Sequence, residues 1–80
     1  MRKFIVGGTI FYMLESGERM QSDNMDYDCS RHYIIWPVTD GWRIRYMWTN
    51  DWESITDKTF DTENAAFNFA YEHFQKATQA

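Results

Sequence analysis

The stretch that decides the fold is Phe60–Gln79, F-D-T-E-N-A-A-F-N-F-A-Y-E-H-F-Q-K-A-T-Q, near the end of an 80-residue chain. Thr62 is a favourable N-cap residue, because its hydroxyl can accept a hydrogen bond from a backbone amide of the first turn. Glu63 then places a negative charge at the positive end of the helix dipole. Neither proline nor glycine interrupts the stretch, and its alanines favour a helix without a rotamer cost. The sequence therefore predicts one helix here.

The helical period separates this segment into an apolar and a polar face. At about 100° per residue, one stripe collects small and aromatic side chains. Its members are Ala66, Phe67, Ala70, Phe74 and Ala77, with Tyr71 on the border. Such a stripe predicts close packing on a sheet formed by upstream residues. Phe69 falls outside the stripe, so we expect its ring to contact another chain, either a second copy or a protein target.

Composition indicates one packed domain spanning residues 1–80. Aromatic residues make up 19% of the chain, which is more than a disordered segment carries. The 12 acidic and 8 basic residues give a net charge of -4, which argues against binding nucleic acid by phosphate neutralisation. The single cysteine, Cys29, cannot form an internal disulfide. The apolar run Phe4–Leu14 is too short to span a bilayer, so we expect a cytoplasmic protein that does not contact membranes.

Residues 32–48 carry the clearest strand signal. Asp40-Gly41 is a pair that two-residue hairpin turns favour, because both central positions need positive φ. A turn centred on this pair places Trp36 opposite Arg45. Polar and apolar residues alternate strictly after the turn, which indicates that one face of the hairpin is buried.

Two further strands are expected on either side of this hairpin. Residues 3–14 favour a strand, and we interpret Gly7-Gly8 as a bulge within it rather than as the turn of a short hairpin. Residues 54–60 can supply a short strand before the helix. Pro37 cannot donate to a ladder, so its strand should lie at an edge or direct this position outward. These elements predict an α+β domain, with a three- to four-stranded antiparallel sheet and one C-terminal helix packed on one face.

Residues that could perform catalysis or bind a metal do not form a known constellation. Cys29 and His32 have the C-x-x-H spacing of a zinc-ligand pair, but a structural zinc site needs four ligands. The only other histidine, His73, lies on the predicted helix. The chain has no glycine-rich phosphate loop, and a thin sheet with one helix offers little room for a cleft. We therefore expect no enzyme activity, no cofactor and no metal.

Two surfaces are candidates for binding a protein partner. The first is the open face of the hairpin, because tryptophan and arginine often dominate interface energies; its residues are Trp36, Arg43, Arg45 and Met47. An ordinary cross-strand cation–π pair is the alternative interpretation of this face. The second surface is an acidic run that either occupies the basic nucleic-acid groove of a partner or is simply solvated. Its candidate contact residues are Asp51, Glu53 and Asp57.

The order of elements resembles the three-strand-plus-helix arm-binding domains of phage integrases. The shared features are the hairpin, the short strand and the helix start F-D-T at residues 60–62, followed by Ala65 or Ala66. This resemblance implies a nucleic-acid-binding module that uses the hairpin face. Arg43 and Arg45 are the basic residues available there.

The chain also resembles small phage anti-CRISPR proteins, in particular one inhibitor of type I systems. The similarity lies in its size and acidity, in K-F-I at residues 3–5 and in F-D-T at residues 60–62 before an aromatic helix. This resemblance implies a non-catalytic inhibitor that acts in the host cytoplasm on a CRISPR–Cas complex, without binding nucleic acid itself. We expect this function first, with the nucleic-acid-binding module as the alternative.

Overall fold

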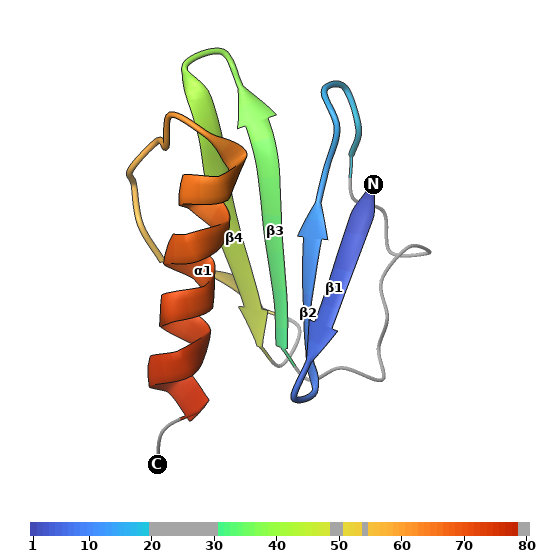
Figure 1. Cartoon of the computed structure of the whole chain (residues 1–80), viewed down its shortest axis with the longest axis vertical. Helices are drawn as coiled ribbons and strands as arrows, with labels where there is room; N and C mark the ends of the chain where they lie inside the picture. The colour runs from blue at the N-terminus through green and yellow to red at the C-terminus, as the bar shows by residue number, and fades with distance from the viewer. Residues whose placement is uncertain (20–30, 49–50, 54, 79–80) are drawn as a thin grey trace.

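The computed structural model describes residues 1–19, 31–48, 51–53 and 55–78. Its elements are β1 (Arg2–Val6), β2 (Thr9–Met13), β3 (Arg31–Val38), β4 (Gly41–Trp48), β5 (Asp51–Glu53) and α1 (Glu63–Thr78). The strands form one sheet in the order β1-β2-β3-β4-β5, and α1 packs on one face over β3 and β4 (Figure 1). The α+β class with a single C-terminal helix on one face is confirmed. The described helix is not long and apolar enough to span a membrane.

The sheet is mostly antiparallel, as expected, but β2 and β3 run parallel. Met13 pairs with Ile35, and the N–H of Leu14 donates to the carbonyl of Ile35 at 2.9 Å. Parallel strands are typically buried on both faces. That holds here, because Ile10 and Phe11 point to opposite faces of β2 and both are fully buried. β3 is therefore a central strand, and Pro37 is tolerated because it lies beyond the end of β2.

Gly7 and Gly8 form the turn of a β1–β2 hairpin, so the expected bulge is wrong. Val6 pairs with Thr9, and the φ angles of the two glycines are +54° and +74°. A two-residue turn of this kind needs positive φ at both central positions, and glycine adopts such values without a steric cost. The strand before the turn begins at Arg2, which gives it enough length to pair along β2.

The β3–β4 hairpin turns at Thr39 and Asp40, one residue before the expected pair, and each residue's cross-strand partner is consequently shifted by two residues. Trp36 therefore pairs with Arg43, whereas the sequence analysis placed it opposite Arg45. Side chains alternate between the two faces of a strand with a period of two. A shift of two residues consequently leaves every side chain on the face that the sequence analysis gave it.

Gly41 follows the turn, and two features favour glycine there: a φ angle of +144° and a close backbone contact with Phe60. Trp42 and Phe60 exchange two backbone hydrogen bonds of 2.8 and 2.9 Å, and a Cβ atom on Gly41 would lie 2.1 Å from the carbonyl oxygen of Phe60. This isolated bridge is the only β pairing that residues 55–60 make within the described chain. The short strand expected over 54–60 is wrong there, and residue 54 lies outside the described part.

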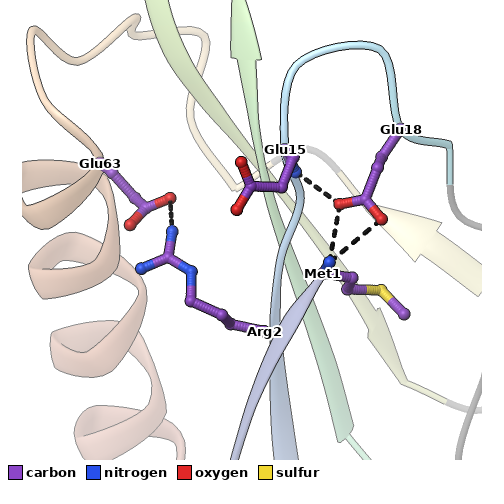
Figure 2. Close-up of polar contacts among 5 residues, drawn as sticks. All are labelled: Met1, Arg2, Glu15, Glu18 and Glu63. Carbon is purple, nitrogen blue, oxygen red and sulfur yellow. Dashed lines mark hydrogen bonds and ion pairs between the residues drawn. The ribbon is translucent and has the colours of Figure 1, made fainter.

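The helix begins where the sequence predicts. The hydroxyl of Thr62 accepts from the N–H of Ala65 at 3.0 Å, which confirms the N-cap. Glu63 in the first turn forms an ion pair with Arg2 of β1 (Figure 2). Most of the apolar stripe packs on the sheet. The buried part of the stripe ends at Phe74, and Ala77, one turn later, is exposed.

Phe69 packs against the core, so the expectation that it points away is wrong. Its ring centroid lies 5.3 Å from that of Phe60, and the side chain is half-buried. The segment before α1 runs alongside the helix (Figure 1). This segment carries Phe60, which is held to β4 by its bridge to Trp42. A helical wheel drawn for packing on one sheet face does not include a neighbour at the side of the helix.

Side chains are buried on both faces of the sheet. The inner core lies between the sheet and α1 and includes Phe11, Tyr33, Ile35, Ile44, Tyr46, Phe60, Ala66, Ala70 and Phe74. A second cluster on the outer face contains Ile10, Tyr12, Leu14 and Ile34, with Met1 and Trp36 packed against it. The open solvated face that the sequence analysis assumed is therefore confined to part of the outer surface.

Candidate binding site

The outer face of the β3–β4 hairpin brings Trp36, Arg43 and Arg45 together. Trp36 lies directly opposite Arg43, while Arg45 lies opposite Ile34 and reaches Trp36 diagonally. The guanidinium carbon of Arg45 is 5.9 Å from the centroid of the Trp36 ring, within the range of a cation–π contact. The predicted Trp36–Arg45 contact is thus present, although through a diagonal and not a direct cross-strand pair.

Met47, the fourth residue predicted for this face, is not available for contact. It is only 5% exposed, and its partner across the β3–β4 pair, His32, is 2% exposed. Both side chains belong to the packed part of the outer face. An already buried thioether offers almost no contact area to a partner, so Met47 is not part of the exposed binding surface.

A hollow of about 230 Å³ lies beside Trp36, and we call it the Trp36 hollow. Its lining combines apolar and charged side chains, namely Leu14, Glu18, Arg19, Ile34, Trp36 and Arg45. Two of these, Trp36 and Arg45, are predicted from the sequence. The residues from 14 to 19 are not, because only the parallel β2–β3 pairing places the end of β2 next to Trp36.

The wall formed by Glu18 and Arg19 is fixed by a compact turn. The N–H of Glu18 donates to the carbonyl of Glu15 at 3.0 Å, and the N–H of Glu15 donates to the Glu18 carboxylate at 2.6 Å. The amino group of Met1 lies 3.0 and 3.1 Å from the two oxygens of the same carboxylate (Figure 2). These two contacts, the Glu15 amide first, lower the pKa of Glu18 below its ordinary value.

Among the described residues that line the Trp36 hollow, the charges without an ion-pair partner are basic, although the whole chain has a net charge of -4. The negative charge of Glu18 is compensated by the amino group of Met1. Arg19 and Arg45 are exposed, and neither takes part in an ion pair between two described residues. Guanidinium groups beside an apolar floor suit a ligand that presents a carboxylate next to an apolar side chain.

The other predicted contact residues lie away from this hollow. Glu53 pairs with Tyr46, which places it on the inner face of the sheet, and Asp57 is exposed in the segment before α1. Asp51 begins β5, but its side chain lies outside the described part. Phe69 contacts Phe60 beside the helix. The structure therefore divides the predicted site into the outer hairpin face and a separate set of scattered residues.

A polar cluster lies between α1 and the sheet. The hydroxyl of Tyr33 and Nδ1 of His73 are 2.6 Å apart, and the His73 ring meets the rings of Tyr33 and Tyr46 edge-on at 5.7 and 5.0 Å. Burial lowers the pKa of His73 and raises the pKa values of Tyr33 and Tyr46. All three are consequently neutral near pH 7, and the hydrogen bond between Tyr33 and His73 joins two uncharged groups.

The cysteine–histidine pair of the sequence analysis is only partly described. Cys29 lies outside the described residues, and His32 is buried with its ring stacked on Tyr12 at a centroid distance of 5.9 Å. Across residues 1–19, 31–48, 51–53 and 55–78, no three histidine, cysteine or acidic side chains gather in a way that could hold a metal ion.

The chain was compared with protein-family models, curated proteins and solved structures, and none of the three comparisons gives a match. The interpretation of the Trp36 hollow therefore rests on its geometry and on the chemistry of its lining.

Proposed function

We propose that the protein is a non-catalytic binding module that holds a partner protein at the Trp36 hollow. The observation that carries this proposal is the Trp36–Arg45 contact beside a floor of Leu14 and Ile34. Tryptophan and arginine are enriched among the residues that dominate interface energies, mainly where neighbouring side chains exclude water. The apolar floor supplies such a neighbourhood beside the charged groups of Arg19 and Arg45.

The size of the hollow favours a protein side chain over a small molecule. Sites for drug-sized ligands usually enclose about 300–1,000 Å³. The Trp36 hollow, at about 230 Å³, is smaller and accommodates one large apolar side chain. Arg19 and Arg45 at its rim can then pair with a carboxylate next to that side chain. The expected partner therefore presents an apolar residue flanked by aspartate or glutamate.

The sequence resemblance to small phage anti-CRISPR proteins suggests how binding would be used. In this proposal the protein acts in the cytoplasm as an inhibitor, and a type I CRISPR–Cas effector complex is the first partner to test. It would inhibit by occupying a surface that the effector needs, since the proposal gives it no chemical step to perform.

A nucleic-acid-binding module is the second candidate, supported by Arg19, which lines the Trp36 hollow together with Arg45 of the hairpin. Arg19, Arg43 and Arg45 could contact phosphates, and Trp36 could stack on a base. Few phosphate contacts and a net charge of -4 argue for weak binding at physiological salt. We therefore place this function behind protein binding.

The deciding experiment measures DNA binding by a purified type I effector in the presence of the wild-type protein or a variant. Trp36→Ala and Arg45→Ala should each weaken the partner interaction by about 1–4 kcal/mol while the fold is kept. Lys76→Ala, which removes an exposed positive charge on α1, is the matched control for Arg45→Ala and should inhibit like wild type.

Two results would contradict the proposal. If the Trp36→Ala/Arg45→Ala double variant inhibits as well as wild type, the Trp36 hollow is not the binding site. If the protein alone binds random duplex DNA with micromolar affinity at physiological salt, the nucleic-acid-binding function is favoured instead.

A further inference from the structure

β1 is an edge strand that exposes apolar side chains. It is the outermost strand of the sheet, and within the described chain only β2 pairs with it. Phe4 is 42% exposed and Ile5 is 57% exposed, and they are the exposed large hydrophobic residues of the described chain. Phe4 faces α1 and Ile5 faces the opposite side, because neighbouring side chains in a strand alternate. An edge with these properties is a template for pairing with another strand.

The hairpin geometry determines which backbone groups of β1 point outward. Residues that flank a two-residue turn exchange both hydrogen bonds, and hydrogen-bonded pairs alternate with non-bonded pairs along an antiparallel ladder. The turn at Gly7-Gly8 makes Val6–Thr9 a bonded pair, and Phe4–Phe11 is therefore bonded as well. The N–H and C=O groups of Lys3 and Ile5 consequently point away from β2, toward the side of β1 that no described strand pairs with.

We propose that two copies of this chain associate through their β1 strands, which pair antiparallel about Phe4. In this register Lys3 faces Ile5 of the second copy and Ile5 faces its Lys3. The outward N–H and C=O groups of Lys3 then form hydrogen bonds with those of Ile5 in the second copy, and the same holds for Ile5 and the second Lys3. All five residues of β1 are paired, and the two sheets continue as one.

Charge favours this register over its neighbours. Pairing about Lys3 would place two lysines directly opposite each other, which is unfavourable in a sheet. Pairing about Ile5 keeps the hydrogen bonds of Ile5 but pairs only Phe4, Ile5 and Val6, and it leaves both Arg2 and Lys3 beyond the paired strand. Lysines on edge strands often prevent association. About Phe4, however, Lys3 lies across from Ile5, and its methylene stem can cover that exposed side chain.

The side of β1 that faces the helix has a groove in which a second copy of the chain could place its Phe4 ring. α1 packs over β3 and β4, whereas β1 meets it only through side chains such as Phe4 and Phe67, whose ring centroids are 5.7 Å apart. A groove of about 570 Å³ remains here, lined by Phe4, Met13, Phe67 and the charged residues Arg2 and Glu63 among others. In the Phe4-centred pair, the Phe4 rings of both copies lie side by side at this groove. Aromatic cross-strand pairs of this kind stabilise sheets.

The test uses charge reversal across the expected pair, read by sedimentation equilibrium over a concentration series. For the wild type, the average mass should approach twice the 9.7 kDa of one chain as concentration rises. Ile5→Lys places a lysine opposite Lys3 of the second copy and should give monomer throughout. The double variant Lys3→Glu/Ile5→Lys places opposite charges across the same pair and should restore the dimer. Asn68→Lys adds the same charge on the exposed face of α1 and should leave association unchanged.

Each other outcome would overturn the proposal. A wild-type protein that stays monomeric excludes the second copy and leaves the edge to a strand of another protein. An Ile5→Lys variant that still dimerises places the contact elsewhere on the molecule. Failure of the double variant to restore dimers, with both variants folded by circular dichroism, rejects the Phe4-centred register.

Discussion

The hydroxyl of Tyr33 and Nδ1 of His73 lie 2.6 Å apart, so one hydrogen bond joins the middle of the sheet to the helix. Burial is the main cause that lowers the pKa of His73, and Arg31 and Lys76 act in the same direction while Glu53 opposes them. The folded protein therefore binds a proton at His73 less readily than the unfolded chain, whose histidine has a pKa of 6.5.

This difference predicts a loss of stability on acidification. Above pH 6.5 the contribution of His73 is fully present, and it is lost as pH falls from there through the lower folded-state pKa. Urea unfolding between about pH 8 and pH 5 should show this decline. His73→Gln should flatten it, because the side chain no longer titrates. An equally steep decline in the variant would show that other groups cause the acid sensitivity.

Phe74 and Phe69 allow a graded test of the core. Phe74→Ala removes a buried ring that meets Phe11 edge-on, and such a loss should cost about 3–5 kcal/mol. A chain of 80 residues has about 4–12 kcal/mol of total stability, so this variant should be largely unfolded or close to it. Phe69→Ala removes a half-buried ring packed on Phe60 and should cost about 1–2 kcal/mol.

Thermal and urea unfolding of both phenylalanine variants separate two possibilities for Phe69. An intermediate loss of stability in Phe69→Ala agrees with packing on Phe60 within one chain. No loss at all would mean that Phe69 is not held by Phe60 in solution. The Phe69 ring would then be available for the contact with another chain that the sequence predicts.

Gly41 and Gly17 test whether the bridge to Phe60 fixes the approach to the helix. Both glycines have positive φ, +144° and +83°, so alanine is strained at either position. Only at Gly41 does the added Cβ also meet backbone, 2.1 Å from the carbonyl oxygen of Phe60. Gly17→Ala should cost about 1–2 kcal/mol, whereas Gly41→Ala should cost about 1–2 kcal/mol more. Equal losses measured by urea unfolding would indicate that the backbone of Phe60 can move away from the added Cβ atom at little cost in stability.

Glu18 and Glu15 test the turn that forms one wall of the Trp36 hollow. Glu18→Ala removes the acceptor for the Glu15 amide and the partner of the Met1 amino group. The Glu15 amide should then exchange with solvent faster, as measured by NMR. Glu15→Ala changes the net charge equally but keeps the turn, because Glu15 contributes through its backbone. Equal protection of this amide in wild type and Glu18→Ala would show that the carboxylate does not hold the turn.

The sequence by itself determined the local features of this protein. Thr62 begins the helix, because an N-cap needs only a hydroxyl and an amide three residues apart. The faces of β3 and β4 follow from alternation, so Trp36 and Arg45 were placed on the same face even though the cross-strand partners differ by two residues from those predicted. These signals act within a few residues and do not depend on the neighbours of each element.

Tertiary structure alone decided where distant segments meet. Leu14 and Arg19 reach Trp36 only because β2 lies parallel to β3, and Phe69 is covered only because Phe60 is bridged to Trp42. Such contacts depend on which arrangement of all the strands buries the most apolar surface. This total is a property of the whole chain, and no local hydrogen bond or sequence periodicity determines it. The same sheet order leaves β1 at the edge, with Phe4 and Ile5 exposed, because the chain has no further described strand to cover it.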